Sequence, residues 1–365
     1  MISKNKLVLL LLLGVMLQAC STMPRAPKIP NLVGSADAPG VYRGVFHVHT
    51  KYSHDSKGTI KQVIKAARGR KLDFVVITDH NNMAAKKDPE IHARKPLLMV
   101  GNEISTTDGH LIALGTRETI STPVEPKKAI QLIHQQDGFA VLAHPVCNRT
   151  AWQDWNVNDF DGMEVYNQAC DVYAANKAVF FFQSLLLPPS LFARYAVLEP
   201  RDALVKWDQI LEKRLVPAYG AADAHVRYRV LGFPLMRYSL SFRAVTMYVM
   251  AKQFSKADIL RSLRHGESYL VFESMGRAED FHFAAKVGEV LFPMGSQTTF
   301  AGKPFGLRIK VPKKAVIRLY RNGEALVESE EKDLQVDQPG AGIYRVEVFR
   351  DGKLWIVSNP IRLEA

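Results

Sequence analysis

Short apolar runs alternate with stretches of helical pattern from residue 41 to about residue 275. The runs have the length of single strands, and they predict strands at residues 42–49, 74–78, 97–104, 111–115, 139–143, 162–166 and 216–221. Helical stretches lie between several of them, among them residues 59–68 and 126–136. Alternating β and α elements predict an α/β fold with a parallel sheet, most simply a barrel.

An insertion interrupts this alternation at about residues 171–213. Its strongly apolar stretch, "AVFFFQSLLLPPSLFARYAVL", is broken by Pro188 and Pro189. We expect two packed helices that cover the barrel, because a proline pair ends one helix and permits another to begin. The alternatives are a surface that touches a membrane and a wall of the substrate pocket. The run is too short to span a bilayer.

The pattern changes again after residue 275. Segments such as "FGLRIKV" and "GIYRVEVFRDGKLWIVS" alternate apolar and polar residues, and "RNGE" and "RDGK" are signals of two-residue hairpins. Residues 276–365 are therefore predicted to form a small antiparallel β-sandwich, immunoglobulin-like, with few candidate catalytic residues.

The first residues have the pattern of an export signal. Two lysines precede an apolar core in "MISKNKLVLLLLLGVMLQAC", and its end resembles the lipobox of bacterial lipoproteins. This resemblance implies a signal peptide at residues 1–19, a lipidated Cys20 and a Pro- and Gly-rich tether at residues 20–40. Ser21 favours the outer membrane of a Gram-negative bacterium, facing the periplasm. An ordinary signal peptide that contains a cysteine is the alternative.

Composition adds two expectations. The chain of 365 residues has a net charge of +12, but its basic residues are dispersed, so no nucleic-acid partner is expected. Membrane contact is expected through the N-terminal lipid, and the oligomeric state is not indicated. Cys147 and Cys170 each follow a predicted strand, and in an exported protein they are predicted to pair. Two free thiols are the alternative.

Histidines and carboxylates gather at the ends of the predicted strands. His47 and His49 are two positions apart on a strand and therefore face the same side. Most of the other predicted strands have further candidates at or near their ends: Asp79, His80, Glu103, His110, His144, Asp223 and His225. One such histidine alone is more often a hydrogen-bonded structural residue. Strand ends of a parallel barrel converge on one mouth, however, and neutral imidazoles with carboxylates are the ligands of borderline divalent ions.

In chain order the motifs H-x-H-T-x-x-S-H, T-D-H-N, G-x-E, G-H-x-x-x-L-G, A-H-P and D-A-H resemble those of one family. They are similar to the polymerase and histidinol-phosphatase (PHP) family of metal-dependent phosphoesterases. The resemblance covers about residues 42–275. It implies a distorted (β/α)7 barrel that holds two or three divalent ions, zinc, manganese or iron.

The resemblance also implies which residue holds which ion. One ion is held by His47, His49, Glu103 and Asp223. Glu103 bridges to a second ion, whose other ligands are His110 and His144. The third is held by His54, His80 and His225. Many family members have aspartate where this chain has His54, whereas a histidine there occurs in the branch with three metals.

The chemistry implied by this ligand set is hydrolysis. A metal-bridging water held by Glu103 and Asp223 is the expected nucleophile. Asp79 is expected to orient a ligand histidine, and Arg227 and Arg229 either anchor an anionic substrate or lie on a solvated loop. The first hypothesis is a phosphoesterase. The alternatives are a carbaryl-hydrolase-like metallohydrolase of carboxyl esters or carbamates, with a small ester as substrate, and a non-catalytic binding lipoprotein.

Overall fold

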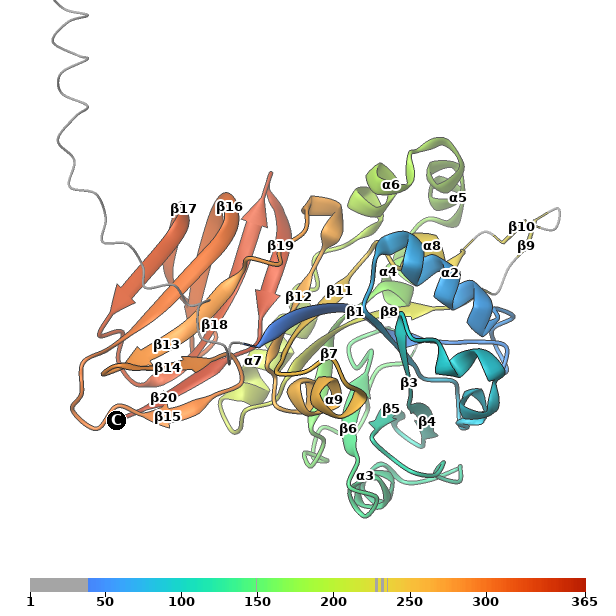
Figure 1. Ribbon diagram of the computed structural model, residues 1–365, viewed down its shortest axis with the longest axis horizontal. Coiled ribbons are helices and arrows are strands. Elements are labelled where there is room, and N and C mark those ends of the chain that lie inside the picture. Colours follow the sequence, from blue (N-terminus) through green and yellow to red (C-terminus); the bar gives the residue numbers. More distant parts are fainter. Residues whose placement is uncertain (1–38, 149, 227–228, 231–232, 235) are drawn as a thin grey trace, which may run out of the picture. The chain divides into compact units, whose positions relative to one another are not determined.

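The computed structural model describes residues 39–365, apart from residues 149, 227–228, 231–232 and 235 (Figure 1). The signal segment, Cys20, most of the tether and Arg227 therefore lie outside the described residues. Within the part that is described, no helix is both long enough and apolar enough to cross a membrane.

The first half of the fold is built on a run of parallel strands. Pairing follows the order β3, β2, β1, β8, β7, β6, and each neighbouring pair is parallel. Their bounds are Leu97–Val100, Phe74–Ile77, Gly40–Val48, Ala218–Ala224, Gly162–Asn167 and Phe139–Ala143. All six coincide with predicted strands, because unbroken apolar runs are typical of strands that are buried on both faces.

Two further strands make this sheet mixed rather than wholly parallel. The predicted strand at residues 97–104 is in fact two strands, β3 and β4 (Asn102–Thr106). β4 and β5 (Gly109–Leu114) form an antiparallel pair, and β5 is also antiparallel to β6. The connection from β4 to β5 is only two residues long, and so short a link permits a hairpin but no parallel crossover. The α/β class is thus established, and the (β/α)7 barrel stays a prediction.

Helices follow the strands as predicted. Thr59 caps α2 (Ile60–Arg70) through a capping box with Gln62, and α3 spans Pro126–His134. The insertion contains α4 (Gln168–Ala174), α5 (Lys177–Leu186) and α6 (Pro189–Ala196). The proline pair separates α5 from α6, which confirms two helices in the apolar stretch. The remaining helices are α7 (Arg201–Leu211), α8 (Tyr238–Ser241), α9 (Lys256–Arg264), η1 (Ala84–Lys87), η2 (Pro89–His92) and η3 (Glu273–Met275).

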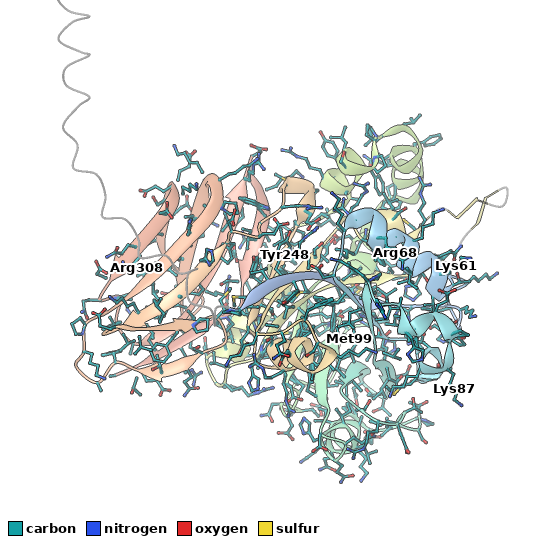
Figure 2. The ribbon with its side chains drawn as sticks, viewed as in Figure 1. Lys61, Arg68, Lys87, Met99, Tyr248 and Arg308 are labelled. Atoms are coloured by element: carbon teal, nitrogen blue, oxygen red, sulfur yellow. A yellow bond between two sulfur atoms is a disulfide. The ribbon has the colours of Figure 1, made fainter. Side chains whose placement is uncertain are left out.

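The sheet continues into the C-terminal strands. The first half of β1 pairs antiparallel with β11 (Thr246–Ala251), which pairs with β12 (Ser268–Val271), and β12 pairs with β19 (Lys353–Ser358). At this junction the Arg43 guanidinium donates to Tyr248 Oη (3.2 Å) and to Glu273 Oε1 (3.0 Å); Tyr248 is labelled in Figure 2. Residues Pro39–Ala365 accordingly form one compact unit, and the predicted division near residue 275 stays a prediction.

The strands after residue 281 form the predicted antiparallel hairpins. Asn322 and Gly323, at φ 52° and 81°, join β16 to β17, and Asp351 and Gly352, at φ 50° and 71°, join β18 to β19. The immunoglobulin-like sandwich stays a prediction. The remaining bounds are β9 Arg229–Val230, β10 Phe233–Pro234, β13 His282–Val287, β14 Val290–Pro293, β15 Gln297–Thr299, β16 Phe305–Arg321, β17 Glu324–Asp337, β18 Gly342–Arg350 and β20 Ile361–Glu364.

Candidate metal centre

The strand end that carries His47 is bent at a bulge. Between two pairings of β1 with β8, Phe46 with Ala221 and Val48 with Ala224, β8 contains one residue more than β1. His47 and Asp223, which face this irregularity, have φ of 65° and 43°. Positive φ is costly for residues other than glycine, and bulges beside active sites re-aim side chains. The bulge therefore turns both side chains toward the same interior point.

Glu103 lies at the centre of the cluster. Its Oε1 is 2.8 Å from His110 Nδ1 and 2.9 Å from His144 Nε2. Its Oε2 is 3.0 Å from the Nε2 atoms of both His47 and His49. The carboxylate is 1% exposed, so these four imidazole nitrogens replace the water that would otherwise solvate it. One carboxylate thus faces two pairs of histidines, one pair on each oxygen.

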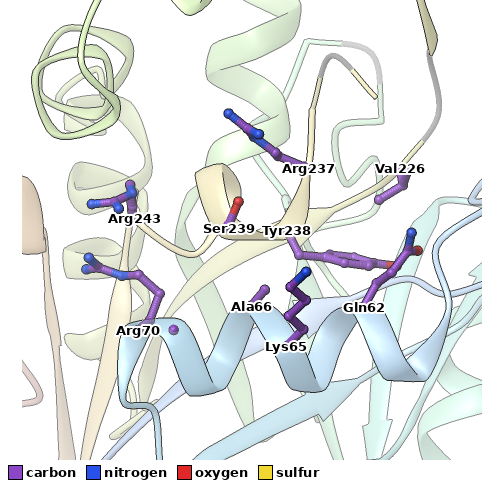
Figure 3. A pocket seen from close by; sticks show the side chains of 10 residues that line it. Gln62, Lys65, Ala66, Arg70, Val226, Arg237, Tyr238, Ser239 and Arg243 are labelled. Carbon is purple, nitrogen blue, oxygen red and sulfur yellow. The ribbon is translucent and has the colours of Figure 1, made fainter. Parts of the chain in front are cut away.

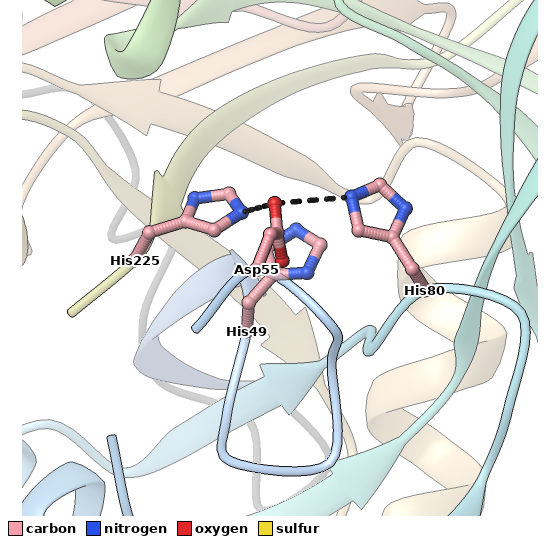
Figure 4. A group of neighbouring side chains, drawn as sticks. All are labelled: His49, Asp55, His80 and His225. Carbon is pink, nitrogen blue, oxygen red and sulfur yellow. Dashed lines mark ion pairs between the residues drawn. The ribbon is translucent and has the colours of Figure 1, made fainter. Parts of the chain in front are cut away.

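A second carboxylate, Asp55, organises the neighbouring group shown in Figure 4. Its Oδ2 is 2.8 Å from His225 Nε2 and 3.5 Å from His80 Nε2. The His49 ring stacks on the His225 ring at 4.0 Å between centroids, which links this group to the one around Glu103. Three sets of side chains have ligand atoms close enough to share one ion: His49, Asp55, His80 and His225; His47, His49 and Glu103; His80, Glu103 and His110.

The donor atoms fit divalent cations better than they fit one another. His47 Nε2 and His49 Nε2 lie 2.9 Å apart while both lie 3.0 Å from the same oxygen of Glu103, and protons cannot satisfy all three contacts at once. Within the described residues, three buried atoms of the cluster make no aligned hydrogen bond, although carboxylates lie near them: His80 Nδ1, Asp223 Oδ1 and His225 Nε2. A cation among these atoms would satisfy them together.

Electrostatics point the same way. Burial raises the pKa of Glu103, but the charges of His80 and His47 outweigh it and hold that pKa well below its usual range. Asp223 is likewise buried, and His47 and His225 keep its pKa well below normal. The pKa of His47 is lowered by burial, yet Asp223 and the other carboxylates around it raise it well above normal. The site therefore keeps its carboxylates ionised and attracts positive charge.

Glu164 belongs to the centre, although the motifs did not single it out. Its Oε1 accepts from His47 Nδ1 at 2.6 Å, and its Oε2 accepts from His144 N at 2.7 Å and Asn167 Nδ2 at 2.9 Å. With Nδ1 donating, His47 presents the lone pair of Nε2 to the cluster. A signal for it was present, because "GMEVYN" places one carboxylate in an apolar strand, where it requires partners.

The structure changes one predicted ligand. His54 is exposed, its ring lies 4.9 Å from that of His80, and it belongs to none of the three sets. Asp55, the next residue, lies instead in the group with His49, His80 and His225. Ser53 Oγ donates to Asp55 Oδ1 at 2.7 Å, which turns that carboxylate inward and leaves the preceding side chain facing outward. The other residues that were predicted as ligands lie close together, and their binding of metal stays a prediction.

Asp79 was expected to orient a ligand histidine, but it bonds the residue next to one instead. Its two oxygens accept from Thr50 N at 2.5 Å and Thr50 Oγ1 at 2.7 Å, so it fixes the residue after His49 rather than an imidazole. Arg229 begins β9, but its side chain, like Arg227, is outside the described part of the chain.

A disulfide supports the loop beside His144. Cys147 and Cys170 are bonded, with Cα atoms 5.6 Å apart, which confirms their predicted pairing. The bond joins the loop after β6 to α4, and both cysteines line a cavity of about 270 Å³ that also reaches His144. The cavity therefore adjoins the cluster at His144 and Glu164.

Comparison with solved structures gives matches of low sequence identity. A two-domain protein of Bacteroides vulgatus, described as containing a predicted PHP-like metal-dependent phosphoesterase, is 15% identical; the match covers 93% of this chain and 100% of that one, with a TM-score of 0.43. PsfC of Pseudomonas syringae is 11% identical over 64% of this chain and 93% of its own, with a TM-score of 0.44.

Sequence comparison is more specific. An uncharacterized protein of Methanocaldococcus jannaschii is 31% identical over 139 residues, which make up 33% of this chain and 79% of that protein. The PHP domain matches residues 46–174, the segment that contains His47, Glu103 and His144. The chain belongs to the PHP domain family.

Proposed function

We propose that this protein is a metal-dependent phosphoesterase that binds two or three divalent ions, zinc, manganese or iron. The observation that carries the proposal is Glu103, whose two oxygens each face a pair of imidazole nitrogens at 2.8–3.0 Å. That arrangement is suited to a carboxylate that bridges two ions.

The ligands divide among the ions as follows. His47, His49, Glu103 and Asp223 would hold one ion, and Glu103, His110 and His144 a second. A third would take His80 and His225, with Asp55 in the place of His54. Bound divalent ions would supply an acidified water and would polarise the phosphoryl oxygen.

The protein's own residues hold this constellation in place. Glu164 fixes the tautomer of His47, and Asp79 fixes Thr50 beside His49. Tyr238 Oη donates to the carbonyl oxygen of His49 at 2.6 Å. These contacts are buried, so the ligands cannot exchange their hydrogen bonds for water. Preorganised ligands of this kind lower the cost of assembling the reactive geometry.

One observation favours a second candidate, the hydrolysis of carboxyl esters or carbamates. Helix α5 exposes apolar side chains, with Phe182 57% and Leu186 73% exposed. An apolar surface on the insertion suits a neutral, apolar substrate better than a charged phosphate ester. The same ligands would serve either reaction, so activity has to distinguish them.

The deciding experiment combines metal analysis with two chromogenic substrates. Metal-replete protein is expected to contain two or three ions per chain and to hydrolyse p-nitrophenyl phosphate or its diester faster than p-nitrophenyl acetate. Glu103→Ala should abolish turnover and lower the metal content, whereas His92→Ala and His134→Ala, outside the cluster, should not. Turnover of acetate alone favours the second candidate. Less than one ion per chain after repletion defeats the metal assignment, and metal without any turnover indicates a binding protein.

We also propose that the mature chain is anchored in the outer membrane through lipid on Cys20 and faces the periplasm. The support is the sequence pattern before Cys20. Cys20→Ser is expected to release the protein from the membrane fraction or to block its maturation. Absence of labelled fatty acid from the wild-type protein would exclude the anchor.

A further inference from the structure

A cavity of about 420 Å³ lies between helix α2 and the segment around α8 (Figure 3). It belongs to neither the metal cluster nor the cavity beside His144. Its lining includes four basic side chains, Lys65, Arg70, Arg237 and Arg243. No acidic residue lines it among the residues that the structure describes. The volume lies within the range of small-molecule sites, about 300–1,000 Å³.

Most of this positive charge is uncompensated. Arg70 Nη2 pairs with Glu273 Oε2 at 2.6 Å, outside the lining. For Lys65, Arg237 and Arg243, the described part of the chain offers no ion pair. Burial lowers the pKa of Arg70, Glu273 raises it, and the charge of the neighbouring Arg243 lowers it again, with a net lowering. Like charges held together in this way are relieved by an anion.

Two donors in the cavity wall lack acceptors. The Nε atoms of Arg70 and Arg243 are both buried without a hydrogen-bond partner in the described residues. In Figure 3 these two arginines lie next to each other at one end of the cavity. Leaving a buried donor unpaired is costly, more so for a charged group. A tetrahedral oxyanion between the two side chains would accept from both.

Gly69 also lines the cavity. Gly69 stands in the last turn of α2, and a Cβ built there would meet no atom within 4 Å. Alanine at such a position would favour the helix by about 0.5–1 kcal/mol. This position therefore has room for a larger side chain, and Ala66 and the Tyr238 ring supply an apolar wall for the organic part of a ligand.

We propose that this cavity is a binding site for a phosphate group carried by a small organic molecule or by a lipid headgroup. Arg70 and Arg243 hold the phosphate, and Lys65 and Arg237 complete the charge balance. The site is separate from the metal centre, because none of the described residues that line it belongs to the metal cluster. Tyr238, whose ring forms part of the wall, donates its hydroxyl to the carbonyl oxygen of His49. The proposal does not depend on the proposed hydrolytic activity.

Calorimetric titration of the full chain in detergent tests the site. The protein is first treated with a chelator, so that no bound metal can capture the phosphate. It is then titrated with inorganic phosphate and with glycerol 3-phosphate. Arg243→Gln should weaken binding on the order of 10- to 100-fold, as expected for loss of a charge-assisted contact. Gly69→Glu, which places a carboxylate in the open space, should abolish it. Arg68→Gln is the matched control: Arg68, labelled in Figure 2, is exposed on the same helix outside the cavity, and binding should be unchanged.

Vesicles containing phosphatidic acid distinguish the two sources of phosphate. Titration from solution identifies a soluble ligand, and retention on vesicles alone, lost in Arg243→Gln, identifies a headgroup. Thermal melting verifies that each variant is folded. The proposal is overturned if the wild type binds neither probe. It is equally overturned if folded Arg243→Gln and Gly69→Glu bind phosphate as the wild type does.

Discussion

Replacing Glu164 by glutamine is expected to weaken metal binding without unfolding the protein. Glutamine has the same shape but only one acceptor oxygen. If that oxygen keeps the hydrogen bonds from His144 N and Asn167 Nδ2, the new amide group faces His47 Nδ1, which now accepts. The proton of His47 then moves to Nε2, the atom that faces Glu103, and its lone pair is lost to a metal.

The magnitude follows from the number of contacts that change. One of three hydrogen bonds to the side chain is inverted, and removing such a partner of a metal-ligating histidine costs about 10- to 100-fold in metal affinity or activity. That factor corresponds to about 1.4–2.7 kcal/mol. The alternative orientation of the amide directs it at a backbone N–H and costs a similar amount, about 1–3 kcal/mol, for an unpaired buried group.

The assay is a competition with a chromogenic chelator, combined with the turnover of an aryl phosphate. Glu347→Gln is the matched control, because Glu347 is equally buried but bonds Arg345 and Tyr320 far along the chain from every ligand. It should lower the melting temperature without changing metal affinity. If folded Glu164→Gln binds metal and turns over substrate as the wild type does, the positioning role is refuted.

Two further substitutions test the remaining assignments. Asp55→Asn should lower activity and metal content at least 10-fold, whereas His54→Ala should change either by less than about 3-fold, since of the two only Asp55 faces the cluster. Metal analysis and turnover measurements check this, and a larger loss in His54→Ala than in Asp55→Asn would contradict the assignment. Burial raises the pKa of Asp171 to about 7, against about 3.9 in an unfolded chain, so its contribution to stability is present below pH 4 and is lost as the pH rises to about 7. Urea unfolding across this range should show a flatter pH dependence for Asp171→Asn, and an identical dependence would mean that the carboxyl is already ionised.

The convergence of the ligands could be predicted because it depends on a simple rule. Apolar runs end where a strand leaves the core, and polar residues that follow parallel strands meet at one edge of the sheet. The wholly parallel sheet was wrong for a reason also visible in the chain. Thr107 and Asp108 leave too little length for a crossover between β4 and β5, and only a hairpin remains.

The choice between His54 and Asp55 could not be made from pattern. Both lie in a turn, where no period relates neighbouring side chains to one face. The decision rests on Ser53 Oγ, which donates to Asp55 Oδ1 and also lies 3.3 Å from His49 Nδ1. Such a contact depends on the backbone path of the turn, which neither apolar periodicity nor residue type specifies.

Glu164 also stabilises strained backbone at the proposed metal centre, in addition to its hydrogen bond with the His47 side chain. Three of the proposed ligand residues, His47, His144 and Asp223, have positive φ, each at a cost of about 1–3 kcal/mol. Glu164 contacts two of them, through the side chain of His47 and the backbone N–H of His144. A backbone held in an unfavourable region persists only where its surroundings fix it, and a buried carboxylate with three charge-assisted bonds does so. The strand β7 that carries Glu164 therefore supports the proposed metal centre, although Glu164 is not itself a proposed ligand.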